Sequence, residues 1–179
     1  MLSRALLAAA LCAAILTSAA SAGDVGVRLT MVGGGSLAVT YDPTAGSAAV
    51  LDGDDQLLRY QLPLTVTDSR SNGAGWNITV TSTLFDNAGK TFAADAASIM
   101  SAKAACLSGG CTMPRNLIEY PVPMPASTPA PAPVEVFDAD GATGMGVFAV
   151  VPTVAVSVPG NAYAGNYVST VAVAVVSGP

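Results

Sequence analysis

The side chains that could carry chemistry in this sequence are carboxylates and cysteines, because the chain contains no histidine. The usual general base and the commonest metal ligand are therefore both missing. Two carboxylates could still work as an acid–base pair, and Asp68 interrupts an otherwise apolar alternating stretch. Arg70 follows two residues later, so an ion pair or a cap of the next turn is the simpler interpretation. With no nucleophile elbow and no phosphate-binding glycine loop in the sequence, the inventory favours a protein that is not an enzyme.

Two acidic runs contain the oxygen ligands that a hard cation such as calcium prefers. They are Asp-Gly-Asp-Asp at residues 52–55 and Asp-Ala-Asp-Gly at residues 138–141. Neither run has the ligand spacing or the distal glutamate of an EF-hand loop, and acidic turns are common on acidic surfaces. We therefore expect no cofactor and no metal site, with a structural calcium ion as the alternative.

The cysteine pair Cys106 and Cys111 frames the short sequence Cys-Leu-Ser-Gly-Gly-Cys. In an oxidising compartment such a pair forms a disulfide by default, and Gly109 and Gly110 give the backbone the freedom to close the loop. Two thiols without histidine make a poor zinc site, and a redox pair normally has the tighter Cys-x-x-Cys spacing. The pattern predicts a structural disulfide.

The N-terminus predicts export. Arg4 precedes a short apolar stretch at residues 5–16, and Ala-Ser-Ala at residues 20–22 is typical of a signal peptidase site. We expect cleavage of residues 1–22, which leaves residues 23–179 as a single secreted domain, extracellular or associated with the cell wall. The apolar stretch is shorter than the roughly 20 residues of a membrane span, so an uncleaved anchor is the weaker alternative. The net charge of −5 argues against nucleic acid and anionic membranes as partners.

Most of the remaining sequence alternates between apolar and polar residues, which is the pattern of half-buried β-strands. The alternating stretches are Leu37 to Tyr41, Leu62 to Ser69, Trp76 to Thr81, Val154 to Val158 and Tyr167 to Val175. Turn residues such as Asp-Gly, Asn-Gly and Pro-Gly-Asn separate them. Short strands without intervening helices predict an all-β fold, an antiparallel β-sandwich of immunoglobulin-like type.

Two segments do not alternate in this way. Residues 93–105 carry alanine, isoleucine and methionine at loosely helical spacing, so a helix is one interpretation there, and a single turn or an irregular loop is an equal alternative. Residues 121–133 contain a proline at nearly every second position, which excludes a strand in a sheet interior. We expect an extended, exposed polyproline-like loop, a surface insertion rather than a recognition strip.

The sole tryptophan, Trp76, follows a glycine-rich turn between two predicted strands. One interpretation is a packing anchor whose indole N–H finds a backbone carbonyl. The other is an exposed ring that stacks on sugars. Physical chemistry alone favours packing.

The sequence around Trp76 resembles the first motif of the WxL-type cell-wall-binding surface domains of Gram-positive bacteria. It reads Leu64-x-Val66-x-Asp68-x-Arg70, then Gly73-x-Gly75-Trp76-x-Ile78. The family's second motif lies at its C-terminus, and Tyr167, Val171, Val175 and Pro179 fall at the matching offsets. Ala172 and Val173 replace the threonine and the second tryptophan of that motif.

The resemblance implies non-covalent association with the cell wall, with peptidoglycan as the ligand and other surface proteins as further partners. It implies wall contacts at Trp76, Ile78 and Tyr167. It implies a supporting structural role for Asp68, Arg70, Val171, Val175 and Pro179. The alternative is a structural β-sandwich subunit of a fimbrial or coat-like surface assembly, because Tyr-Ala-Gly-x-Tyr followed by alternating valines also occurs near the ends of such subunits.

Overall fold

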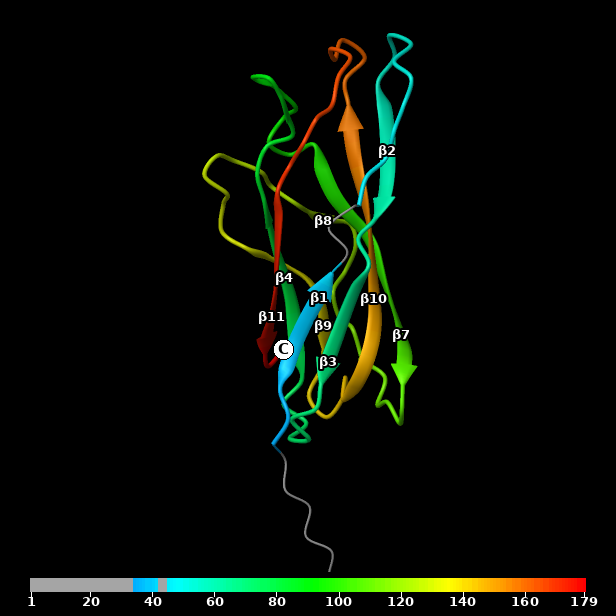
Figure 1. The fold of residues 1–179 in the computed structure, drawn as a ribbon, viewed down its shortest axis with the longest axis vertical. Coiled ribbons are helices and arrows are strands. Elements are labelled where there is room, and N and C mark those ends of the chain that lie inside the picture. Colours follow the sequence, from blue (N-terminus) through cyan, green and yellow to red (C-terminus); the bar gives the residue numbers. More distant parts are fainter. Residues whose placement is uncertain (1–33, 42–44) are drawn as a thin grey trace, which may run out of the picture. The chain divides into compact units, whose positions relative to one another are not determined.

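Two antiparallel β-sheets packed face to face form the structure, which is a computed structural model (Figure 1). It describes residues 34–41 and 45–179, within one compact unit, Val32–Pro179. The predicted signal peptide, residues 1–22, lies outside the described residues. Those described ranges contain strands and loops only, so no helix there could cross a membrane.

The larger sheet is organised around one long strand, β10. Its strands are β1 (Leu37–Tyr41), β2 (Gln56–Gln61), β3 (Leu64–Asp68), β7 (Ala97–Ser108), β8 (Val122–Pro123) and β10 (Gly146–Val158). Their order is β1-β3-β10-β7-β8, and β2 also pairs with β10. The first part of β10 pairs with β3, where Phe148 faces Val66, and the last part pairs with β2, where Val156 faces Leu58. The strand β10 therefore runs from one end of the sandwich to the other.

The smaller sheet has the order β11-β4-β9. Its strands are β4 (Trp76–Ser82), β9 (Val134–Ala139) and β11 (Val171–Ser177), and a separate short hairpin joins β5 (Asp86–Asn87) to β6 (Lys90–Thr91). Strand β11 pairs with β4 so that Val175 faces Ile78. The part of the first WxL-like motif that lies in β4 is thus a neighbour of the second motif in this sheet, whereas Leu64–Asp68 of the first motif forms β3 in the larger sheet.

The core lies between the two sheets and follows the predicted alternation. In β4 every second side chain is buried, beginning at Trp76, and in β3 the buried side chains are Leu64, Val66 and Asp68. Apolar residues at period two place one face of each strand against the opposite sheet. The all-β antiparallel sandwich is therefore confirmed, whereas the immunoglobulin-like strand order stays a prediction.

The expectation for residues 93–105 is wrong, because most of this segment belongs to strand β7. Pairing with β10 from Val156 opposite Ala97 to Val147 opposite Ser108 outweighs the local helical tendency of alanine and methionine. Sheet hydrogen bonds formed over this length favour the extended backbone regardless of local propensity.

The proline-rich segment 121–133 is also more integrated than expected. Its strand β8 pairs with the edge of β7, and the Met124 side chain is fully buried in the core. Ala126 is buried beside it and bridges to Ser82 of β4. The expectation of an exposed surface insertion is therefore wrong for the first half of the segment. Its prolines lie in and beside an edge strand, where a missing N–H is tolerated, and residues between them pack into the core.

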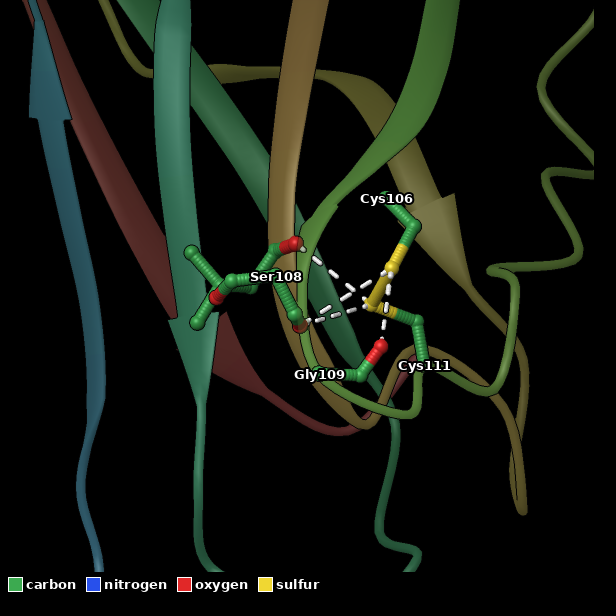
Figure 2. The surroundings of a disulfide bond; sticks show 5 residues. Cys106, Ser108, Gly109 and Cys111 are labelled. Atoms are coloured by element: carbon green, nitrogen blue, oxygen red, sulfur yellow. Dashed lines mark hydrogen bonds between the residues drawn. A yellow bond between two sulfur atoms is a disulfide. The ribbon is translucent and has the colours of Figure 1, made fainter.

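The predicted disulfide joins Cys106 to Cys111 at the end of β7, with the two Cα atoms 6.0 Å apart (Figure 2). The Cys111 sulfur lies 3.4 Å from the Ser108 carbonyl oxygen and 3.6 Å from that of Val147. Thr112 then donates a backbone hydrogen bond to Met145. The disulfide loop therefore turns the chain back toward the start of β10.

Candidate functional site

The motif residues Asp68 and Arg70 form a nearly buried ion pair, as the sequence predicts. The Arg70 Nε and Nη2 atoms each donate to one oxygen of the Asp68 carboxylate at 2.9 Å. The guanidinium also donates to the Gly75 carbonyl oxygen at 2.8 Å and to the Ser177 hydroxyl. The hydrogen bonds from Arg70 lower the pKa of Asp68 below its ordinary value of 3.8. The pair therefore ties the turn before β4 to the end of β11.

Trp76 is fully buried, and the one polar group of its side chain, the indole N–H, is hydrogen-bonded inside the protein. Its indole N–H donates to the Gly144 carbonyl oxygen at 2.8 Å, and its ring stacks on Phe137 at 5.6 Å between centroids. Gly144 has a φ of +72°, and a Cβ there would lie 2.6 Å from the indole nitrogen. The packing interpretation is confirmed. We call Asp68, Arg70, Trp76, Phe137 and Phe148 the Trp76 end of the sandwich.

The prediction that Trp76 and Ile78 contact a wall ligand is therefore wrong for this fold. Both side chains are fully buried between the two sheets, because even positions of β4 face the core. Val171 and Val175 also point inward from β11 and are half-buried, and Pro179 is exposed after the strand has ended. The motif residues of β3, β4 and β11 pack together in the core and build no binding surface there, whereas Tyr167 of the second motif precedes β11.

A surface groove of about 880 Å³ lies over β2 and the last part of β10. Figure 1 shows these two strands side by side at the end of the sandwich away from the C-terminus. Its floor is formed by inward-facing apolar residues of β2 and β10, including Leu58, Tyr60 and Val156. One side is formed by residues 45–49 and the other by residues 162–171. We call this hollow the tyrosine groove.

Aromatic rings dominate the side of the groove near the β5–β6 hairpin. Phe92 stacks on Tyr167 with the ring centroids 4.1 Å apart, and Phe85 lies 6.0 Å from Phe92. Tyr163 is 62% exposed, and the Lys90 Nζ atom lies 4.8 Å from the centroid of its ring. Of the three predicted wall contacts, Tyr167 is the one that lines this groove.

Three of the groove tyrosines differ in their hydrogen bonding from Tyr120, which packs against the core. The Tyr120 hydroxyl donates to the Val136 carbonyl oxygen at 2.7 Å and accepts from the Asn116 amide. The hydroxyls of Tyr60, Tyr163 and Tyr167 make no hydrogen bond within the described ranges. Burial raises the pKa of Tyr60 above its ordinary value of 10.0, so its phenol is a neutral donor at physiological pH. These hydroxyls are available to a ligand.

Among the described residues, no charged side chain lines the tyrosine groove. Elsewhere, too, the described residues bring together no group of three or more cysteine and carboxylate side chains that could hold a metal ion. In the acidic run at residues 138–141, Asp138 accepts a hydrogen bond from the Leu117 backbone and Asp140 pairs with Arg115. Binding in the groove therefore depends on aromatic faces and neutral hydrogen-bonding groups.

Sequence reasoning identified Tyr167 but missed most of the groove. Tyr60, Phe85, Phe92 and Tyr163 come from segments that the chain brings together only when folded. One signal was present, since Tyr163 and Tyr167 lie four residues apart in a glycine-containing turn. Aromatic rings spaced along a loop that flanks a sheet are candidates for a ligand platform.

No model of a known protein family matches the chain, and no curated protein or solved structure is significantly similar to it. The resemblance to WxL-type domains therefore rests on the two motifs in the sequence.

Proposed function

We propose that this protein is a secreted, non-catalytic surface protein that associates non-covalently with cell-wall peptidoglycan through the tyrosine groove. The observation that carries the proposal is the set of tyrosine rings whose hydroxyls have no partner in the described structure. Binding pockets typically combine an apolar lining with a few unpaired polar groups that orient the ligand. The tyrosine groove has both features.

A sugar ring has the complementary chemistry. Its axial hydrogens form an apolar face that packs on an aromatic ring, and its hydroxyl and acetamido groups donate and accept hydrogen bonds at the rim. Tyr163 offers an exposed face, and the hydroxyls of Tyr60 and Tyr167 lie along the same hollow. Rings with two χ angles lose little conformational entropy on binding, which favours tyrosine at such sites.

The motif resemblance also supports peptidoglycan as the ligand, but the proposed contact surface is the tyrosine groove and not Trp76 and Ile78. The first motif supplies the packed turn of the Trp76 end, and the second supplies strand β11, whose preceding loop carries Tyr163 and Tyr167. The motifs would thus shape the scaffold, and the loop before β11 would make the contacts. The structural subunit of a surface assembly is the competing function.

Co-sedimentation with purified peptidoglycan sacculi tests this proposal. We expect the wild-type protein to pellet with sacculi and Tyr163→Ala to bind about fivefold more weakly, because one aromatic stacking contact contributes about 1 kcal/mol. Leu117→Ala is the matched control, since Leu117 is also exposed, at 55%, and does not line the groove. Tyr163→Phe separates the ring from the hydroxyl.

Equal binding by wild type, Tyr163→Ala and Leu117→Ala would show that the wall contact lies elsewhere. A folded wild-type protein that stays in the supernatant at every salt concentration would contradict wall association altogether. That second result would favour the structural subunit.

A further inference from the structure

Lys90 lies at the edge of the tyrosine groove and is the cation nearest to its exposed ring. It belongs to β6, and its ammonium group lies 4.8 Å from the centroid of the Tyr163 ring. The hairpin that carries Lys90 packs on the loop of Tyr163, because a Cβ at Gly165 would overlap the side-chain amide of Asn87. The hairpin backbone that carries Lys90 therefore lies against the loop that lines the groove.

The charge of Lys90 is not neutralised by an ion pair in the part of the chain that is described. The ion pairs found there are Arg70 with Asp68 and Arg115 with Asp140. The other charged residue of the hairpin, Asp86, accepts a hydrogen bond from the Gly89 backbone N–H at 3.1 Å. The Asp86 carboxylate thus holds the turn, and the Lys90 ammonium faces Tyr163.

The electrostatics of the groove single out this residue. The chain carries a net charge of −5, and the described residues of the groove lining include no charged side chain. An acidic protein repels anions in general, so one cation beside a neutral aromatic site creates a local attraction for anions there. A cation held over a ring still has free N–H donors for a second partner.

From this arrangement we infer that the tyrosine groove selects an anionic glycan, whose sugar ring packs on Tyr163 while a carboxylate or phosphate on the glycan pairs with Lys90. The inference rests on the proposed function and adds the charge of the ligand to it. Lys90 is then the residue that determines specificity, and the tyrosines supply affinity common to charged and neutral glycans.

Binding to three soluble polymers tests the inference with the whole secreted chain. The polymers are polygalacturonate, which carries carboxylates, a poly(glycerol phosphate), and a neutral oligomer of N-acetylglucosamine. We compare wild type, Lys90→Gln and the matched control Lys103→Gln, whose lysine is exposed on β7 and does not line the groove. Titration calorimetry at low and high salt gives the affinities.

We expect wild type to prefer one or both anionic polymers, and Lys90→Gln to bind them about fivefold more weakly, the size of a partly exposed ion pair. Affinity for the neutral oligomer should stay the same, and Lys103→Gln should match wild type throughout. The carboxylate and phosphate polymers distinguish the two sources of negative charge. High salt should remove the preference for anions.

Equal affinities of wild type for neutral and anionic polymers would overturn the inference and leave the proposed function intact. Equal losses in Lys90→Gln and Lys103→Gln would also overturn it, because attraction would then be non-specific. A folded wild type that binds none of the polymers and no sacculi would reject both the inference and the proposed function.

Discussion

The two ends of the sandwich use the same kinds of side chain in opposite ways. At the Trp76 end the indole N–H is paired with Gly144, and the nearby Tyr120 hydroxyl is paired with Val136. At the tyrosine groove the hydroxyls of Tyr60 and Tyr163 have no partner among the described residues. An aromatic residue whose polar atom is hydrogen-bonded inside the protein contributes to stability. One whose polar atom is left at the surface can hydrogen-bond a ligand.

The comparison also separates sequence motif from binding site. The resemblance to a wall-binding family centres on Trp76, yet Trp76 belongs to the closed end of the molecule. If the groove carries the function, substitutions at the two ends must have different effects. Those at the Trp76 end should change the free energy of unfolding, and those at the groove should change binding.

The largest expected effect is that of Trp76→Ala. Deleting a fully buried tryptophan leaves a cavity and an unpaired Gly144 carbonyl, so the free energy of unfolding should fall by about 3–5 kcal/mol. Urea unfolding followed by far-UV circular dichroism measures the change. Trp76→Phe keeps most of the volume and should lose less. A folded Trp76→Ala variant of wild-type stability would contradict the distinction between the ends.

The next effect in size is that of Asp68→Asn, which leaves the Arg70 guanidinium without its charged partner. Breaking a largely buried pair by removing one member should cost about 3 kcal/mol at neutral pH. Because folding lowers the pKa of Asp68 below 3.8, its stabilising contribution is present above that pH and is lost as the pH falls through the lower folded value. Urea midpoints between neutral pH and strongly acidic pH measure both effects.

In the Asp68→Asn variant this acid-dependent loss should be absent, since the asparagine does not titrate. The remaining carboxylates still titrate in the variant, so the comparison is made as the difference between the two stability curves. A difference that is constant over the whole pH range would show that the ion pair is unimportant for the Trp76 end.

The smallest expected effect on stability is that of Tyr163→Ala, although the same substitution should weaken sacculus binding. The Tyr163 side chain is 62% exposed, so the free energy of unfolding should change by less than about 0.5 kcal/mol. Urea unfolding of the variant checks this. A large destabilisation would mean that Tyr163 is part of the packing, and the two ends would then not differ in the way described.

The parts of the fold that the sequence predicted correctly are those where burial of one face decides the structure. The alternation in β3 and β4 places Leu64, Val66, Trp76 and Ile78 in the core, and the Asp68–Arg70 pair and the disulfide followed from spacing alone. Local pattern is sufficient in these cases, because period two fixes which side chains face inward.

The parts that the sequence did not predict depend on partners far away in the chain. Strand β7 is extended because it pairs along β10, and the proline-rich segment is ordered because Met124 enters the core. The tyrosine groove joins residues from β2, the β5–β6 region and the loop before β11. No spacing rule within one segment can reveal such a surface.

The prolines at the middle of the larger sheet have a consequence for how the molecule opens. Strand β3 ends its pairing with β10 at Val150, and β2 begins at Thr153. Between them, Pro63 and Pro152 lack N–H groups, and one hydrogen bond, from Leu62 to the Pro152 carbonyl, joins the strands at this level. The ladder is thus interrupted on the β2 and β3 side of β10 alone, because on the other side β7 pairs with β10 across the same level, with Val151 opposite Lys103 and Thr153 opposite Ser101. β2 and β3 can therefore separate at this level while the pairing of β10 with β7 stays closed.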